Sequence, residues 1–356
     1  MKQALVTGAA GFIGFHLVRA LLRAGYAVVG IDNLNSYYSP ALKLARLAES
    51  GIDADTLEKE GKASSVKGEP YRFLKLDLAH REAMERLFEE NHFDLVINLA
   101  GQAGVRYSIE NPYSYVESNV LGFLNVLECC RHHRPDHLLY ASSSSVYGLQ
   151  ETTPYREDQM TDTPVSLYAA TKKSNELMAH AYSKLYGIPA TGLRFFTVYG
   201  PCGRPDMAYF GFTDKLVKGE TIKIFNYGNC KRDFTYVDDI VEGVVRVMQH
   251  APEKQLGEDG LPVPPYTVYN IGNNQPENLL DFVQILQEEL VRAGVLPEDY
   301  DFEAHKELVP MQPGDVPVTY ADTTPLERDF GFKPSTPLRE GLRKFAEWYE
   351  EYKQQA

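Results

Sequence analysis

A tyrosine and a lysine four positions apart, Tyr168 and Lys172, are the residues whose types and spacing most directly indicate chemistry. The segment 166–186 has a helical pattern, so this spacing places both side chains on one helix face. A free phenol has a pKa of about 10, but a nearby ammonium favours the phenolate. The tyrosine could then take a proton from a hydroxyl while hydride leaves the same carbon. An ordinary surface pair is the alternative interpretation, because this spacing is common on helices.

A serine run, Ser142 to Ser145, follows an apolar segment that predicts a strand over 137–142. We expect these hydroxyls at the carboxyl end of the strand, where ligands of α/β sheets bind. One of them could hydrogen-bond the reacting hydroxyl beside Tyr168. A flexible linker is the alternative, but the apolar residues Val146 and Tyr147 on the other side disfavour it.

Three glycines at three-residue spacing, Gly8, Gly11 and Gly14, separate an apolar run from an amphipathic segment over 15–24. Such a strand, turn and helix lets backbone N–H groups approach a diphosphate at the helix N-terminus. The next predicted strand, 26–31, ends in Asp32, where a carboxylate can bind the ribose hydroxyls of NAD and repel the 2′-phosphate of NADP. A glycine turn that only packs a helix on a sheet would not explain this acid.

The elements that position these residues alternate along the chain. Strands are predicted near 4–7, 26–31, 73–78, 95–100, 137–142 and 190–196, and helices over 15–24, 41–50, 81–91, 112–131 and 166–186. This alternation predicts an α/β fold with a doubly wound parallel (Rossmann) sheet. Residues 37–70 interrupt it as a surface insertion, in which we expect 51–70 to be a loop.

The pattern changes after Pro201, where glycine, proline and short apolar pieces alternate. Helices are expected over 238–250, 279–293 and 338–352. We therefore predict a cofactor-binding domain over 1–200, to which 236–272 returns. A smaller, discontinuous, substrate-binding α/β domain would comprise 201–235 and 273–356. The ligand cleft is expected between this domain and the carboxyl ends of the strands.

The formal net charge of −13 disfavours a nucleic-acid partner. The four cysteines show no metal-ligand spacing, so no metal is expected. No apolar run is long enough for a membrane span, and the first strand begins without a signal peptide, so we expect a cytoplasmic protein with no membrane partner. The helices at 112–131 and 166–186 could form a homodimer interface or pack within one subunit.

Together these motifs resemble the extended short-chain dehydrogenase/reductases of the nucleotide-sugar epimerase group. The matching segments are Gly8-x-x-Gly11-x-x-Gly14, Asp32-Asn33, Asp77-Leu78, Ser143, Tyr168-x-x-x-Lys172, residues 193–201 and Arg232-Asp233-Phe234. Within the group, residues 102–108, 142–148, Thr197 and 203–208 are most similar to UDP-glucuronate 4-epimerases. The resemblance implies NAD as cofactor, a UDP-sugar as substrate and a place in carbohydrate metabolism and polysaccharide biosynthesis.

The resemblance also implies individual roles. Residues expected to hold the cofactor are Gly8, Gly11, Phe12, Ile13 and Gly14 at the pyrophosphate, Asp32 and Asn33 at the adenosine ribose, Asp77 and Leu78 at adenine, Leu99, Ala100, Gln102, Asn119, Ser142 and Phe196 along the cleft, and Tyr168 and Lys172 near the nicotinamide ribose. Residues expected to hold the substrate are Ile224 and Phe225 at uracil, Arg232 and Arg204 at the diphosphate, Asp315 at the uridine ribose, and Ser143, Ser144, Ser145, Tyr168 and Thr197 at the sugar. Arg106 is a further candidate, for which a loop salt bridge is the alternative.

Two departures narrow the expected reaction. UDP-galactose 4-epimerases usually carry asparagine where Thr197 stands, and dehydratases and decarboxylases carry an acid just before Val-Tyr-Gly, where this chain has Ser144 and Ser145. The small hydroxyl side chains at these positions can bind the carboxylate of a uronic acid. They cannot supply the acidic group that an elimination reaction requires. We therefore expect conversion of UDP-glucuronate to UDP-galacturonate through a transient 4-keto sugar, with Ser143, Tyr168 and Lys172 as catalytic residues. The alternatives are a UDP-glucose/UDP-galactose 4-epimerase, a UDP-glucuronate decarboxylase and a non-catalytic NAD-sensing module.

Overall fold

The computed structural model describes residues 1–257, 260–311 and 316–355. The chain divides into two compact units. Unit 1 comprises Met1–Gly148, Met160–Arg194 and Val241–Tyr269, and unit 2 comprises Leu149–Gln159, Phe195–Ile240 and Asn270–Ala356. The main change from unit 1 to unit 2 lies at 194/195, a few residues before the boundary expected at 200. The short segment 149–159 groups with unit 2, although the sequence pattern placed it in the first domain.

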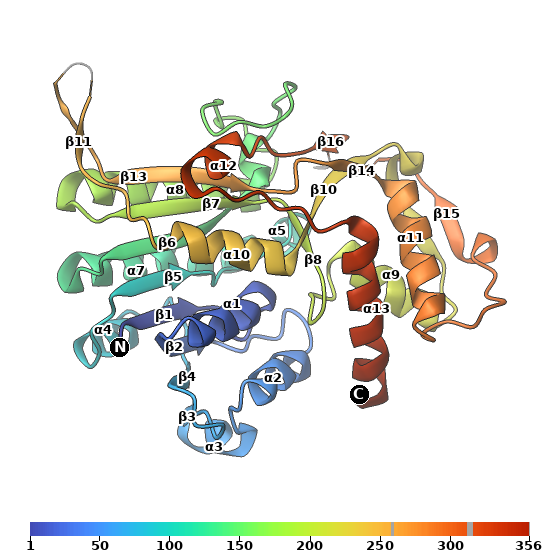
Figure 1. The fold of residues 1–356 in the computed structure, drawn as a ribbon, viewed down its shortest axis with the longest axis horizontal. Helices are drawn as coiled ribbons and strands as arrows, with labels where there is room; N and C mark the ends of the chain where they lie inside the picture. The colour runs from blue at the N-terminus through green and yellow to red at the C-terminus, as the bar shows by residue number, and fades with distance from the viewer. Residues whose placement is uncertain (258–259, 312–315, 356) are drawn as a thin grey trace. The chain divides into compact units, whose positions relative to one another are not determined.

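Unit 1 is built on an eight-stranded sheet, in the order β13-β7-β6-β5-β1-β2-β4-β3 (Figure 1). Its strands are β1 (Gln3–Thr7), β2 (Ala27–Asp32), β3 (Lys62–Ser64), β4 (Tyr71–Lys75), β5 (Leu95–Asn98), β6 (His137–Ser143), β7 (Ala190–Phe195) and β13 (Tyr266–Ile271). β1 pairs in parallel with both β2 and β5. The strand order reverses at this point, and ligands of doubly wound sheets bind at the carboxyl ends of the strands there.

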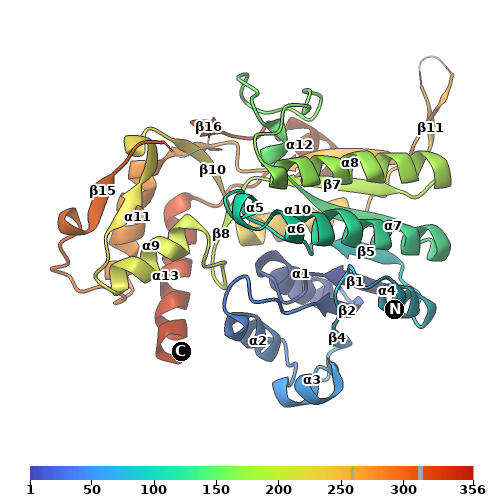
Figure 2. The same ribbon diagram turned by 180° about the vertical axis from the view of Figure 1, so that it is seen from behind.

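Helices cover both faces of this sheet, as the alternation predicted. α1 (Phe12–Arg23) lies on one face, and α4 (Arg81–Glu89), α7 (Gly122–His133) and α8 (Leu167–Tyr186) lie on the other (Figures 1 and 2). Apolar side chains such as Phe88, Val96, Phe123 and Leu138 form the buried core against the second set of helices. Removing this apolar surface from water stabilises the arrangement of helices on the sheet.

The insertion is more ordered than the sequence suggested. The expected helix is present as α2 (Pro40–Glu49), but the loop predicted over 51–70 is wrong, because it contains α3 (Ala54–Glu60) and β3. The Asp53 side chain caps α3 by accepting from the Thr56 N–H at 2.8 Å, and Gly61 ends it in the left-handed conformation. β3 then pairs antiparallel with β4 at the sheet edge. The charged composition of this segment predicted a loop, because β3 is stabilised by its pairing with β4 rather than by its own residues.

Two predicted elements differ in detail from the observed ones. β4 ends at Lys75, before the predicted end of that strand, so Asp77 and Leu78 follow it in a loop. The helix predicted over 112–131 starts as α6 (Pro112–Tyr115), continues through a π-helical turn η1 (Val116–Leu121) and becomes α7. π turns inside helices frequently occur at functional sites, and this one carries Asn119.

Unit 2 contains a smaller sheet around β10 (Lys231–Tyr236), which pairs with β14 (Pro276–Asn278), β16 (Val318–Thr319) and β8 (Thr197–Tyr199). The other described elements of the C-terminal half are α9 (Ala208–Val217), β9 (Ile222–Ile224), η3 (Phe225–Gly228), α10 (Val237–Val247), β11 (Gln255–Leu256), β12 (Pro262–Val263), α11 (Leu279–Arg292), η4 (Glu303–His305), β15 (Lys306–Leu308), α12 (Thr324–Phe330) and α13 (Leu338–Gln355). The sequence pattern predicted α10, α11 and α13 but neither α9 nor α12. Across the described ranges, no helix combines the length and apolar composition needed to cross a membrane.

Candidate active site

The glycine turn between β1 and α1 has backbone requirements that only glycine meets. Gly8 has a φ of +69° and its carbonyl accepts from the Gly11 N–H at 2.9 Å. A Cβ on Gly14 would lie 2.1 Å from the Gly8 oxygen. Gly11, the residue that precedes α1, provides no side-chain cap, so the N–H groups of the first helical turn are exposed to a ligand rather than capped by this residue. This cradle fits the pyrophosphate of a dinucleotide.

The end of β2 carries the expected acid, together with a cation that sequence reasoning missed. Asp32 is buried, and its Oδ1 accepts from the Leu34 N–H at 2.8 Å. The ammonium of Lys43, also buried, lies 3.6 Å from the same oxygen. Nearby, Asn33 donates to Asp77 at 2.8 Å, so two predicted adenosine contacts from different strand ends bind each other. The helical pattern of 41–50 could have predicted that Lys43 lies on the buried face of that helix.

A second missed cation lies beneath the glycine turn. Arg46 is 1% exposed and comes from the same helix as Lys43. Its guanidinium donates to the Ala10 carbonyl at 2.9 Å and to the Tyr38 hydroxyl at 2.8 Å. The insertion therefore supports the cofactor turn directly, which its surface-like composition did not suggest.

At the point of strand reversal, side chains fix the loop that follows β5. Thr7 donates to Asn98 at 2.7 Å and accepts from the Ala100 N–H at 3.0 Å. Asn119, in the π turn, accepts from the Gln102 N–H at 2.7 Å and donates to Gln102 oxygen and to Thr171, both at 3.0 Å. Asn119 thus joins the predicted cleft loop to helix α8 beside Lys172.

Helix α8 presents the tyrosine and lysine. Its N-terminus is capped by Ser166, whose side chain accepts from the Ala169 N–H at 3.1 Å. Lys172 is 5% exposed and donates to the Ala141 carbonyl at 3.0 Å, which joins α8 to the end of β6. The ring of Tyr168 meets the edge of buried Tyr115, with centroids 6.1 Å apart. These contacts hold both side chains in place, which disfavours the alternative of a solvated surface pair.

The serine run ends β6 and begins a short 3-10 helix, η2 (Ser144–Tyr147). Ser143 caps that helix by accepting from the Ser145 N–H at 3.2 Å, and it also accepts from the Ser145 hydroxyl at 2.9 Å. Its own proton is therefore directed to another acceptor. Ser142, predicted to contact the cofactor, donates to the carboxylate of Glu176 at 2.7 Å. The alternative of a flexible linker is excluded, because the run is part of regular structure.

Predicted ligand contacts in unit 2 lie on several of its elements. Phe196, a predicted cofactor contact, precedes β8. Of the predicted substrate contacts, Thr197 begins β8, Ile224 is buried in β9, and Phe225 begins η3. Arg232, on β10, donates to the Lys231 and Pro317 carbonyls at 3.0 and 3.1 Å.

The remaining predicted substrate contacts differ in their surroundings. Arg204 binds Asp206 through two hydrogen bonds of 3.0 and 2.5 Å, so a carboxylate already faces this candidate anion contact. Arg106, in unit 1, is exposed before α5 (Tyr107–Glu110). Asp315 lies outside the described residues.

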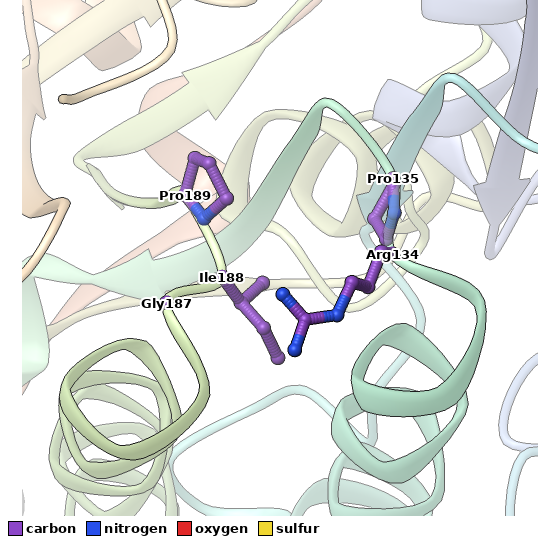
Figure 3. Close-up of a pocket in the computed structure, with 5 residues that line it drawn as sticks. All are labelled: Arg134, Pro135, Gly187, Ile188 and Pro189. Carbon is purple, nitrogen blue, oxygen red and sulfur yellow. The ribbon is translucent and has the colours of Figure 1, made fainter.

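One pocket lies away from all of these residues. Arg134, Pro135, Gly187, Ile188 and Pro189 line it, where β6 and β7 begin rather than end (Figure 3). The predicted strand and loop residues of unit 1 lie at or after the carboxyl ends of strands, so this pocket is not the candidate active site. Among the described residues, no group of three or more His, Cys, Asp or Glu side chains is arranged to hold a metal ion.

The fold and the site define a dinucleotide-binding α/β enzyme with a Tyr–Lys pair. Residues 4–272 match the NAD dependent epimerase/dehydratase family, and the chain belongs to this family. It is 47% identical to UDP-glucuronate 4-epimerase 4 of Arabidopsis thaliana over 355 residues, which cover 98% of this chain and 75% of the relative. It is 48% identical to protein CapI of Staphylococcus aureus, with 98% of each chain covered.

The structure is also similar to a solved one. The UDP-glucuronic acid 4-epimerase of Bacillus cereus, crystallised with UDP-glucuronic acid and NAD, matches with a TM-score of 0.81 at 30% identity and with 98% and 99% of the two chains covered. These findings confirm the predicted family, the α/β fold class and NAD as the cofactor.

Proposed function

We propose that the chain is an NAD-dependent 4-epimerase that interconverts UDP-glucuronate and UDP-galacturonate. The observation that carries this proposal is the hydroxyl segment Ser143–Ser145 at the end of β6. It is part of regular structure, contains no acidic side chain, and directly follows Ala141 and Ser142, which bind Lys172 and Glu176 of α8. The relatives named UDP-glucuronate 4-epimerases support the substrate.

The cofactor fits the cradle that the glycines leave open. Gly8, Gly11, Phe12, Ile13 and Gly14 would surround the pyrophosphate, because backbone N–H groups at a helix N-terminus bind anions. The remaining proposed contacts are Asp32, Asn33, Asp77 and Leu78 at the adenosine, and Leu99, Ala100, Gln102, Asn119, Ser142, Phe196, Tyr168 and Lys172 along the rest of the cofactor. Bound NAD supplies a hydride acceptor that is regenerated within each turnover.

The proton transfer belongs to Tyr168. As a phenolate it takes the proton of the sugar O4 while C4 is oxidised, and it returns the proton when C4 is reduced. The ammonium of Lys172, one helical turn away, favours the phenolate. Ser143 donates to O4, since it is the acceptor in both hydrogen bonds from Ser145 and its own proton is left for the sugar. The transient 4-keto sugar must present its other face before reduction, which inverts C4.

The carboxylate of the sugar requires separate binding, because a 4-keto uronic acid is a β-keto acid and can lose CO₂. Ser144, Ser145 and Thr197 are the proposed carboxylate contacts. Several neutral hydroxyl donors hold the carboxylate in a fixed orientation. An acidic side chain at position 144 or 145 would repel the sugar carboxylate and assist elimination. The serines at these two positions do neither, and so favour epimerisation.

The UDP part is assigned to unit 2. Ile224 and Phe225 would border uracil, and the guanidinium of Arg232 would bind the diphosphate, for which its geometry is suited. Arg204 and Arg106 are further anion contacts, and Asp315 would bind the uridine ribose. Asp233, beside Arg232, accepts from the backbone N–H groups of Asn273, Asn274 and Ala321 at 2.6, 3.1 and 2.9 Å, and so fixes the neighbouring loops.

The decisive experiment incubates the purified enzyme with UDP-glucuronate and separates the products. UDP-galacturonate supports the proposal. UDP-xylose or a released 4-keto pentose would instead identify a decarboxylase. A parallel incubation with UDP-glucose tests the neutral sugar, and faster turnover of that sugar would identify a UDP-galactose 4-epimerase.

We also propose a homodimer through the helices at 112–131 and 166–186. These helices lie on the same face of unit 1 (Figure 2). Large apolar side chains are exposed on or beside them: Ile109, Tyr113, Val116, Leu121, Leu177 and Leu185. Light scattering should give twice the chain mass, and a monomer at micromolar concentration would contradict this.

A cytoplasmic location and a role in polysaccharide biosynthesis complete the proposal. The four cysteines are buried thiols, as expected in a reducing compartment. Cell fractionation should find the protein with soluble cytoplasmic markers. Disruption of its gene should remove galacturonate from surface polysaccharide, and an unchanged polysaccharide composition would contradict the assigned role.

A further inference from the structure

A buried ion pair that the proposed reaction does not use lies next to the hydroxyl segment. Glu176 and Arg194 join through two hydrogen bonds of 2.8 and 2.9 Å, and each side chain is only 4% exposed. Burying two charges costs desolvation energy, so such a pair is weak evidence for a stabilising role. Its other contacts indicate what it does instead.

The pair holds both ends of the hydroxyl segment. At one end, Ser142 donates to the same carboxylate oxygen of Glu176 that binds Arg194, at 2.7 Å. At the other end, Arg194 donates to the hydroxyl of Tyr147 at 3.0 Å and lies over its ring at 4.9 Å. Ser143, Ser144 and Ser145, followed by the buried Val146, lie between these two anchors.

The same pair is fixed relative to the catalytic tyrosine. Tyr168, Lys172 and Glu176 follow one another at four-residue steps on α8, and therefore lie on one face of that helix. Lys172 binds the carbonyl of Ala141, the residue before Ser142. One helix face thus sets the position of both the proton acceptor and the hydroxyl segment.

We propose that Glu176 and Arg194 are positioning residues that hold Ser143–Ser145 in register with Tyr168 throughout the turnover. The proposal rests on the proposed function for the identity of the substrate. A loosened segment would hold the 4-keto sugar less well between oxidation and reduction. Each UDP-4-keto-sugar that escapes leaves its hydride on the cofactor, so one NADH remains bound for each molecule released.

The test compares two tyrosine-to-phenylalanine variants on the same stretch of chain. Tyr147→Phe removes the anchor hydroxyl at Arg194. Tyr140→Phe is the matched control, because Tyr140 is equally buried on β6 and binds the Tyr266 hydroxyl at 2.8 Å rather than the ion pair. Ser142→Ala removes the anchor at the other end. All three are measured as full-length enzyme with bound NAD.

We expect kcat to fall about tenfold in Tyr147→Phe and Ser142→Ala, less than the roughly 100-fold that an ångström of misplacement costs. KM for the UDP-sugar should change by less than about threefold, because the UDP contacts lie elsewhere. NADH absorbance should accumulate during turnover. Tyr140→Phe should lose similar thermal stability but keep wild-type kcat and show no NADH accumulation.

Wild-type kcat without NADH accumulation in both anchor variants would overturn the proposal, as would equal losses of kcat in Tyr147→Phe and Tyr140→Phe. The substrate is tested separately by the wild-type enzyme. If it epimerises UDP-glucose but not UDP-glucuronate, the proposed function fails, and the same comparison on UDP-glucose still decides the role of the ion pair.

Discussion

His137 provides a prediction whose size follows from the structure. It is 2% exposed at the start of β6, the strand that ends in the hydroxyl segment. Its Nδ1 lies 3.2 Å from the Met248 carbonyl, which can only accept, so this nitrogen carries the proton. Its Nε2 lies 2.8 Å from the Thr191 hydroxyl and accepts from it. The ring is therefore neutral in the folded protein, and a second proton would have to occupy Nε2.

Burial lowers the pKa of His137 from 6.5 to about 4, although the bond to Met248 acts in the opposite direction. Between these two values the unfolded chain binds a proton that the folded chain does not, so folding stability falls as the pH is lowered. At about pH 5 the unfolded histidine is almost fully protonated and the folded one about a tenth protonated. The corresponding loss is about 2 kcal/mol.

The assay is urea unfolding at about pH 7.5 and about pH 5, in the wild type and in His137→Gln. The variant is expected to be less stable at neutral pH, but its pH-dependent loss should be smaller than that of the wild type by about 2 kcal/mol. Carboxylates contribute equally to both proteins, so their effect cancels in the comparison. The same pH-dependent loss in both proteins would refute the assignment of a neutral buried imidazole.

Three further predictions concern the candidate site. Gly14→Ala should abolish NAD retention, because its Cβ would lie 2.1 Å from the Gly8 carbonyl oxygen. Gly25→Ala, at the other end of α1, strains a backbone φ of +83° but meets no atom within 4 Å, so it should lose some stability and still retain NAD. Equal NAD content in the two purified proteins would contradict this. Tyr168→Phe should lower kcat by about 10²- to 10⁴-fold while NAD stays bound, and near-normal turnover would remove the tyrosine from the mechanism. Lys43→Met should weaken binding of NADP more than of NAD, because the Lys43 ammonium, 3.6 Å from Asp32, offsets the repulsion between Asp32 and a 2′-phosphate. Fluorescence titration measures the affinity for each cofactor, and an equal loss of the two affinities would contradict this reason.

Sequence reasoning succeeded where the relevant interactions are local. The glycine turn is formed by residues three positions apart, and Tyr168 and Lys172 share a helix face because of the helical repeat. It failed over 51–70, where β3 exists because β4 supplies its hydrogen bonds. The π turn at Asn119 was also missed, since its side chain binds Gln102, 17 residues earlier in the chain, and its carbonyl accepts from Asn175.

The sequence by itself determined the α/β alternation of the first domain, the cofactor class and a candidate proton acceptor, because each depends on residue type at short spacing. Only the tertiary structure decided which side chains support those residues. Lys43 reaches Asp32 because the insertion folds back onto the glycine turn. Arg194 reaches Glu176, 18 residues away, because β7 lies beside β6 beneath α8. Such contacts depend on how elements pack, and packing is set by the shapes of many buried side chains together rather than by any local pattern.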